Sequence, residues 1–250
     1  MFRAAKNLIN GLGGILIVTL AFMFIGANLI LYGDSLSTNT YIDTNGGFGE
    51  YTGDAYIVVK NNEPTDIYNM GTEPRITLRP SAFGGKCDYA EAVITKDTLR
   101  NDKPNTDYMY SRLSGWRRVS LKQMLGADYS DTEYVFHQCQ LVPYMLYGWE
   151  TVEDGNYITG TCYLDEEAIQ PIAQQIFDYV DSTGKVVWYI ADPSFYSDEK
   201  LARGIHIQAM SEDGEFKLNV YCFNVHPDIV VDYKRGYTWK SLNWWVKKKW

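Results

Sequence analysis

The chain has 250 residues, of which 46% are hydrophobic and 15% aromatic, so it can bury a core and is not disordered over most of its length. This length accommodates one ordinary domain with an anchor, or two small domains. The formal net charge of −8 argues against a surface built to hold a polyphosphate backbone, although a local basic groove stays compatible with it.

The N-terminal segment predicts a membrane anchor. Residues 8–32 carry no charged side chain, which provides the roughly 20 apolar residues that a helix needs to cross a bilayer. Arg3 and Lys6 precede this segment and Asp34 follows it, so the positive-inside rule places the N-terminus in the cytoplasm and the rest outside the cell. A cleaved signal peptide is the alternative interpretation. We expect residues 1–33 to form a cytoplasmic N-terminus and a transmembrane anchor.

Residues 34–53 are rich in Ser, Thr, Asn and Gly, which is typical of a linker. The pattern of residues 54–240 predicts an α+β ectodomain around an antiparallel sheet. Apolar residues at helical spacing predict one helix over 166–181, ended by Thr183 and Gly184. Strands are expected at 55–60, 75–79, 87–94, 134–141, 186–190, 204–209 and 216–225.

The four cysteines are far apart in the sequence, and no two have a metal-binding spacing, so a zinc site is not expected. Two interpretations stay open: disulfides in an extracellular domain, or four buried thiols that act as small hydrophobic residues. These cysteines are Cys87, Cys139, Cys162 and Cys222.

The C-terminal segment 241–250 contains three tryptophans and three lysines. Such a tail could lie at a membrane interface or contact a polyanion. A solvated or core-packed terminus is the alternative.

Several sequence blocks carry a family resemblance. They are residues 85–90, 114–116, 134–144, 156–164, 193–195 and 219–233. In order and spacing they resemble the DNA/RNA non-specific endonuclease family with a ββα-metal (His-Me finger) site, and most closely the secreted or membrane-tethered nucleases of Gram-positive bacteria. The resemblance covers more than half of the chain. It implies a nuclease-like α+β fold, which here would follow the transmembrane helix expected from residues 8–32.

The resemblance also implies positions for the catalytic groups. In that family a strand reads Arg-Cys-His-Leu and its histidine is the general base, while an asparagine on the following helix holds one Mg²⁺. Here the strand reads Gln-Cys-Gln-Leu, so Gln140 occupies the position of the base and Gln138 that of the arginine. An amide has no basic nitrogen and cannot take a proton from water.

Three further positions follow from the same resemblance. Asp165 stands where the metal-binding asparagine would be, and a carboxylate there could still bind Mg²⁺. Asn156, which helps to order the site in related proteins, is retained. Ala173 replaces a glutamate that some relatives carry on the helix.

His137 is the nearest residue that could replace the missing base. Side chains alternate along a strand, so His137 and Cys139 share one face while Gln138 and Gln140 share the other. We therefore expect His137 to be a partly buried histidine that does not reach the site.

These substitutions favour a membrane-anchored extracellular nuclease-like protein that does not cut and acts in binding or scaffolding. Its partner would be a nucleic acid or a cell-surface protein, and the acidic ectodomain favours the protein. The first alternative is an active, divergent Mg²⁺-dependent endonuclease that uses Asp165. The second is a cell-envelope protein in which the fold is a spacer. No small-molecule cofactor is implied.

Overall fold

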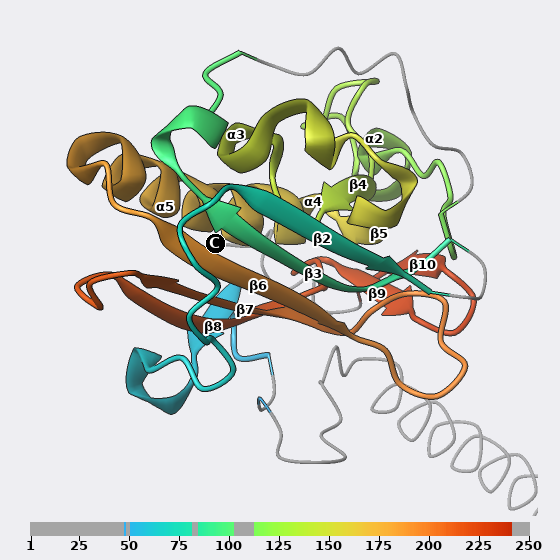
Figure 1. Cartoon of the computed structure of the whole chain (residues 1–250). Coiled ribbons are helices and arrows are strands. Elements are labelled where there is room, and N and C mark those ends of the chain that lie inside the picture. The colour runs from blue at the N-terminus through green and yellow to red at the C-terminus, as the bar shows by residue number, and fades with distance from the viewer. Residues whose placement is uncertain (1–47, 49–50, 82–84, 103–112, 242–250) are drawn as a thin grey trace, which may run out of the picture. The chain divides into compact units, whose positions relative to one another are not determined.

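The structure, a computed structural model, describes residues 48, 51–81, 85–102 and 113–241 (Figure 1). The expected anchor, most of the linker and the tail beyond Ser241 lie outside these residues. Within the described ranges, no helix combines the length and the apolar character that crossing a bilayer would require.

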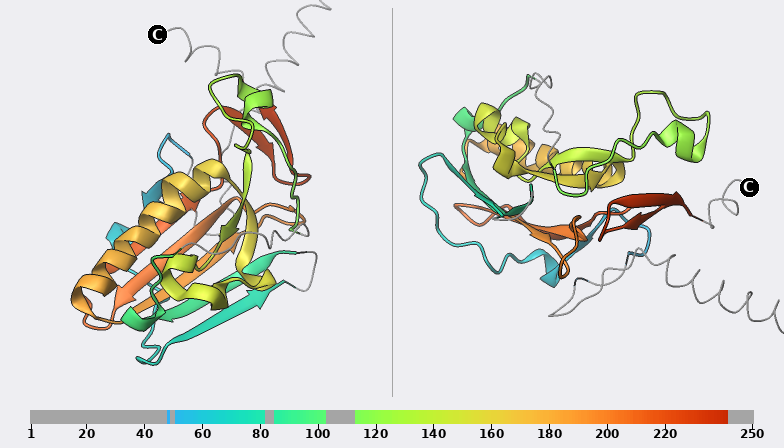
Figure 2. Two further views of the ribbon diagram at one scale, coloured as in Figure 1. Left: turned by 90° about the horizontal axis from the view of Figure 1, so that it is seen from above. Right: turned by 90° about the vertical axis from the view of Figure 1, so that its right-hand side faces the viewer.

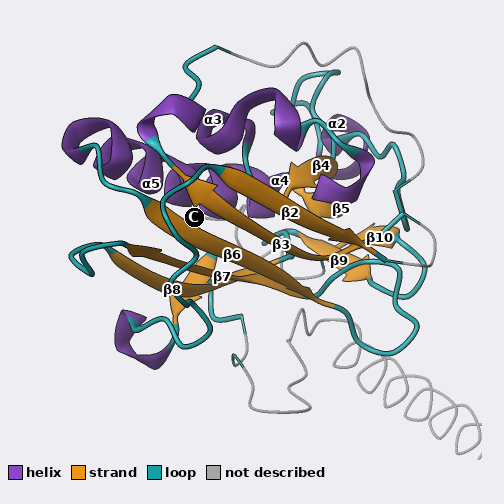
Figure 3. Cartoon of the chain, viewed as in Figure 1, coloured by secondary structure: helices purple, strands orange, loops and turns teal. Residues whose placement is uncertain are grey.

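A six-stranded antiparallel sheet forms the centre of the domain (Figure 3). Its order is β1-β8-β7-β6-β3-β2, and every neighbouring pair is antiparallel. The four inner strands are buried along most of their length and are rich in apolar residues, although each also carries polar side chains. The strands are β1 (Tyr56–Val58), β2 (Arg75–Pro80), β3 (Cys87–Ile94), β6 (Val187–Ser194), β7 (Gly204–Ser211) and β8 (Lys217–Phe223).

Helix α5 (Gln170–Thr183) covers one face of this sheet (Figures 1 and 2). Its apolar residues recur at helical spacing and are buried against Ile94, Tyr189 and Ile207 of the sheet in the main core. Gly184, at φ 69°, ends the helix in the left-handed conformation that glycine adopts readily, and its N–H donates to the carbonyl of Val180.

The opposite face of the sheet is covered by the connection between β1 and β2. Ile67 and Met70 of this connection pack against Val93, Trp188 and Ile190 of the sheet. The indole N–H of Trp188 also donates to the carbonyl of Gly71, 2.8 Å away. Both faces of the sheet are therefore buried.

Shorter elements lie on the α5 side of the sheet and at its end (Figure 2). Two of them are two-stranded antiparallel ladders, formed by β4 with β5 and by β9 with β10. The elements are α2 (Leu121–Leu125), β4 (Phe136–Gln140), α3 (Tyr144–Tyr147), β5 (Tyr157–Thr161), α4 (Cys162–Leu164), β9 (Ile229–Asp232) and β10 (Tyr237–Lys240). One-turn 3₁₀ helices occur at Lys60–Asn62, Lys96–Thr98, Gly148–Thr151 and Asp154–Asn156.

The expected α+β class with an antiparallel sheet is confirmed. Each expected strand is present, with ends that differ by at most four residues. The expected helix begins differently, because a π-helical turn over Asp165–Ile169 precedes α5. The strands β5, β9 and β10 and the short helices α2, α3 and α4 were not expected.

The four cysteines are free, buried thiols. Of the two interpretations left open by the sequence, the structure supports the second. Burial raises the pKa of all four thiols, and that of Cys162 rises to about 12. They act as small hydrophobic residues and not as reactive groups.

Candidate functional site

The β4–β5 ladder positions the candidate site. In its register His137 lies opposite Gly160, and Gln140 lies opposite Tyr157. Gly160 is required here, because a Cβ at this position would overlap the thiol of Cys139 and lie 3.0 Å from Leu164 Cδ2. The thiol of Cys139 thus fills the space between the ladder and α4.

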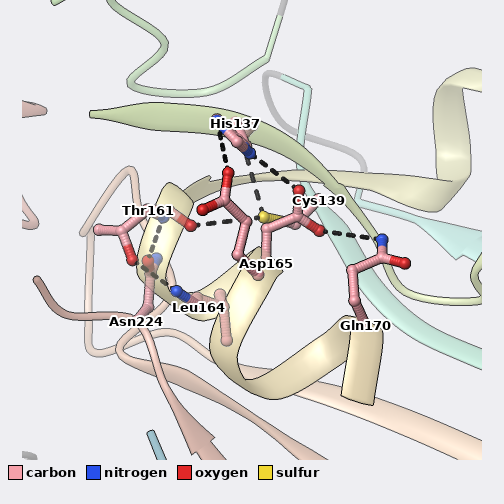
Figure 4. Close-up of polar contacts among 8 residues, drawn as sticks. His137, Cys139, Thr161, Leu164, Asp165, Gln170 and Asn224 are labelled. Carbon is pink, nitrogen blue, oxygen red and sulfur yellow. Dashed lines mark hydrogen bonds and ion pairs between the residues drawn. The ribbon is translucent and has the colours of Figure 1, made fainter. Parts of the chain in front are cut away.

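The turn from β5 into α4 is fixed by two buried side chains. The Oγ1 of Thr161 accepts the N–H of Leu164 at 3.0 Å and donates to the carbonyl of Val225 at 2.6 Å, so it begins the helix and ties it to the end of the sheet. Asn224 accepts the N–H of Thr161 at 2.8 Å and donates to the carbonyl of Thr159 at 3.2 Å. These contacts fix the start of the helix that carries Asp165 (Figure 4).

Asp165 faces His137. Its Oδ2 lies 2.9 Å from His137 Nδ1, and its Oδ1 lies 3.4 Å from the amide nitrogen of Gln170 (Figure 4). Asp165 begins the π-helical turn, a distortion that is frequent at functional sites. Glu166 follows on the same turn, and its Oε1 lies 3.8 Å from His137 Nε2. The imidazole therefore lies between two carboxylates.

These contacts shift the pKa of His137. Burial alone would lower the pKa of the imidazole, since it disfavours the charged form. The hydrogen bond and the charge of Asp165, together with the charge of Glu166, outweigh burial and leave the pKa of His137 raised. The contact between His137 and Asp165 is partly buried, with 29% and 20% of the side chains exposed, and it becomes an ion pair when the imidazole is protonated.

This pairing corrects the expectation for His137. The alternation along β4 holds, since His137 shares a face with the buried Cys139. That face, however, is turned towards α4 and the π-helical turn, which is where Asp165 lies. Cys139 was the sequence signal for this orientation, because the face that carries an apolar residue packs against the rest of the domain.

Both the nitrogen and the oxygen of the Gln140 side-chain amide form hydrogen bonds. Its Nε2 lies 3.2 Å from the carbonyl oxygen of Thr151, 3.1 Å from the hydroxyl of Thr151 and 3.1 Å from that of Tyr157. Its Oε1 accepts the N–H of Tyr144 at 2.9 Å. The side chain joins the end of β4 to the start of α3, the 3₁₀ turn Gly148–Thr151 and β5.

The other positions implied by the resemblance lie in different surroundings. Gln138 is half-buried on the strand face of Gln140 and pairs with Thr159 in the ladder. Asn156 is buried and holds the segment after β4, because it bonds both the N–H and the carbonyl of Val142, at 2.9 and 2.8 Å. Ala173 is buried in the main core on α5.

The residues around Asp165 limit the kind of metal site that could form. In the described part of the chain, no group of three or more His, Cys, Asp or Glu side chains is arranged to hold an ion. Mg²⁺ is often held by only one or two carboxylates and keeps several waters. Asp165 fits that pattern through Oδ1, whose contact with Gln170 Nε2 is 3.4 Å long, because Oδ2 is engaged by His137 at 2.9 Å.

Comparison with solved structures identifies proteins with a similar fold. The NucA protein of Streptococcus agalactiae, solved with a magnesium ion bound, superimposes with a TM-score of 0.61 at 17% identity, over 72% of this chain and 84% of its own. The Sda1 nuclease, solved with a zinc ion, superimposes with a TM-score of 0.52 at 21% identity, over 65% of this chain and 80% of its own. Neither a protein-family model nor a curated protein sequence matches the chain. The domain thus shares with these two proteins an α+β fold that has an antiparallel sheet and a ββα nuclease-like core.

Proposed function

We propose that this chain is a membrane-anchored extracellular protein whose nuclease-like domain binds a partner and does not cleave nucleic acid. The observation that carries the proposal is the bonding of Gln140, which occupies the position of the general base. Both ends of its amide bond to protein groups. The anchor and the extracellular placement rest on the uncharged segment 8–32 and the preceding Arg3 and Lys6.

Hydrolysis of a phosphodiester requires a group that takes a proton from the attacking water. The amide of Gln140 cannot take it, and its bonds to Thr151, Tyr157 and Tyr144 leave it poorly placed to orient a water. Loss of a general base costs about 10²- to 10⁴-fold in rate. The neutral Gln138 would also bind a phosphate less strongly than an arginine would.

The charge distribution favours a protein partner over a nucleic acid. From Asp34 onward the chain carries 21 basic and 31 acidic residues, a formal net charge of −10. Glu166 and Glu167 are exposed beside the His137–Asp165 pair. A polyphosphate backbone would be repelled there, whereas a basic protein surface would be attracted.

One observation favours a second function, which is nuclease activity through a different base. The contact of His137 with Asp165 has the geometry in which a carboxylate orients a catalytic histidine. In this alternative His137 would deprotonate the water, and a hydrated Mg²⁺ on the remaining oxygen of Asp165 would stabilise the charge that develops on the phosphate.

A series of variants of the full-length chain separates the two functions. Supercoiled plasmid would be incubated with the detergent-solubilised protein in Mg²⁺ or Mn²⁺, and nicking would be followed with time. If the loss of the base explains an inactive protein, Gln140→His or its combination with Gln138→Arg creates activity where none existed. If His137 is the base, the unaltered chain already nicks, His137→Ala removes the activity and Gln140→His changes it little.

A further inference from the structure

A cavity of about 170 Å³ lies beside the His137–Asp165 pair, between α2, the start of β4, α4 and the π-helical turn. Three buried residues contribute to its lining, namely Leu121, Cys162 and His226. Three half-buried tyrosines also line it, namely Tyr129, Tyr134 and Tyr163. The volume is well above the ~10–15 Å³ that one water needs.

Three carboxylates line this cavity, and Arg118 lies against the lining residue Tyr134. Glu133, Glu166 and Glu167 are exposed and line the cavity, and the described lining residues include no Lys or Arg. Any positive charge on His137 is matched by Asp165 and Glu166. The surrounding acids also act on Tyr129, whose pKa is raised by burial and by the charges of Asp228 and Glu133.

One of the lining rings already contacts a guanidinium group. The guanidinium carbon of Arg118 lies 4.7 Å from the centre of the Tyr134 ring, and its Nη2 donates to the Tyr134 hydroxyl at 2.6 Å. A planar guanidinium stacks on aromatic rings and binds carboxylates with a fixed fork of donors. Arg118 already engages Tyr134, so Tyr129 and Tyr163 are the lining rings that remain for a second guanidinium, next to the lining carboxylates.

We propose that this cavity is the site at which the domain binds its partner, and that it takes an arginine side chain of a partner protein. The inference rests on the binding function proposed above. Tyr129 and Tyr163 would contact the planar guanidinium and its aliphatic stem, while the exposed carboxylates of Glu166 and Glu167 would match the charge. The cavity is smaller than the ~300–1,000 Å³ of sites for drug-sized ligands, so it suits one side chain better than a nucleotide.

The test measures binding of N-acetyl-arginine methylamide to the full-length chain in an uncharged detergent at pH 7 and low salt. N-acetyl-citrulline methylamide is the neutral probe of the same shape. Saturation-transfer NMR detects contact, and titration gives the affinity. The variant pair Glu166→Gln with Glu167→Gln removes two lining charges, and Glu150→Gln with Glu153→Gln removes two exposed charges elsewhere. Thermal unfolding of each variant checks that it is folded.

The arginine probe is expected to bind about tenfold more tightly than the citrulline probe. The Glu166/Glu167 variant should weaken arginine binding about three- to tenfold, while the Glu150/Glu153 variant leaves it unchanged. The proposed site would be rejected if the arginine probe did not bind, or if both probes bound equally well. It would also be rejected if the Glu166/Glu167 variant bound the arginine probe as tightly as the unaltered chain. Plasmid nicking by the unaltered chain would reject the proposed function, which is a separate outcome.

Discussion

The Nδ1 of His137 on β4 lies 2.9 Å from the Oδ2 of Asp165, the residue that begins the π-helical turn. This contact determines how the site responds to pH. It also forms a polar contact in the nuclease-like core in which Gln140 takes no part.

The stabilising effect of this pair should decrease as pH rises. The pKa of His137 is raised above its ordinary value of 6.5, so its contribution is complete below that value and is lost as pH rises through the higher pKa of the folded state. His137→Gln is expected to cost about 1 kcal/mol at pH 6 and progressively less towards pH 9. Urea unfolding of both proteins at several pH values measures this difference. A cost that is constant or increases with pH would contradict the pairing.

Gly160→Ala should destabilise the domain, because the added Cβ would overlap the Cys139 thiol. Overpacking of this kind typically costs about 1–3 kcal/mol. Adding Cys139→Ala removes the overlapping atom, so the double variant should be less destabilised than the sum of the two single variants. The comparison is a double-mutant cycle measured by denaturant unfolding. Additive costs would show that the close approach is not the cause.

Asn156→Ala should lower the free energy of unfolding by about 2–4 kcal/mol. The amide bonds the N–H and carbonyl of Val142 and the carbonyl of Thr151, and its loss leaves these buried groups without that partner. Asn69→Ala is the control, because Asn69 is exposed and bonds only the nearby N–H of Gly71. Equal stability of the two variants would contradict the structural role of Asn156.

The four cysteines should be unreactive in the folded protein. They are buried, and burial raises the pKa of each thiol, so little thiolate is present at neutral pH. A thiol-specific reagent such as DTNB is expected to react slowly with the native chain and with all four thiols once guanidinium is added. Fewer than four reactive thiols in the unreduced, unfolded chain would instead indicate a disulfide.

The sequence predicted the elements in which apolar residues recur at the spacing of a helix or a strand. Helix α5 and most strands of the six-stranded sheet carry clear apolar patterns, and all of these elements are present. The strands β9 and β10 have four residues each and pair mainly with one another. Their conformation depends on tertiary contacts, such as Ile229 and Val231 packing with Leu121 of α2, and not on local pattern.

The candidate site was predictable only in part. Alternation correctly separates His137 from Gln140, but it does not say on which side of β4 the following helix packs. The π-helical turn that begins at Asp165 has no sequence signal of its own. The partners of Gln140 come from three other segments of the chain, so its bonding is a property of the folded domain.

The most direct test of the central claim is the rate at which the unaltered full-length chain nicks supercoiled plasmid in Mg²⁺, measured beside Asp165→Ala. With Gln140 as a structural amide, both proteins should leave the plasmid intact to the same extent as buffer. Robust nicking by the unaltered chain that Asp165→Ala abolishes would contradict the account and identify an active nuclease.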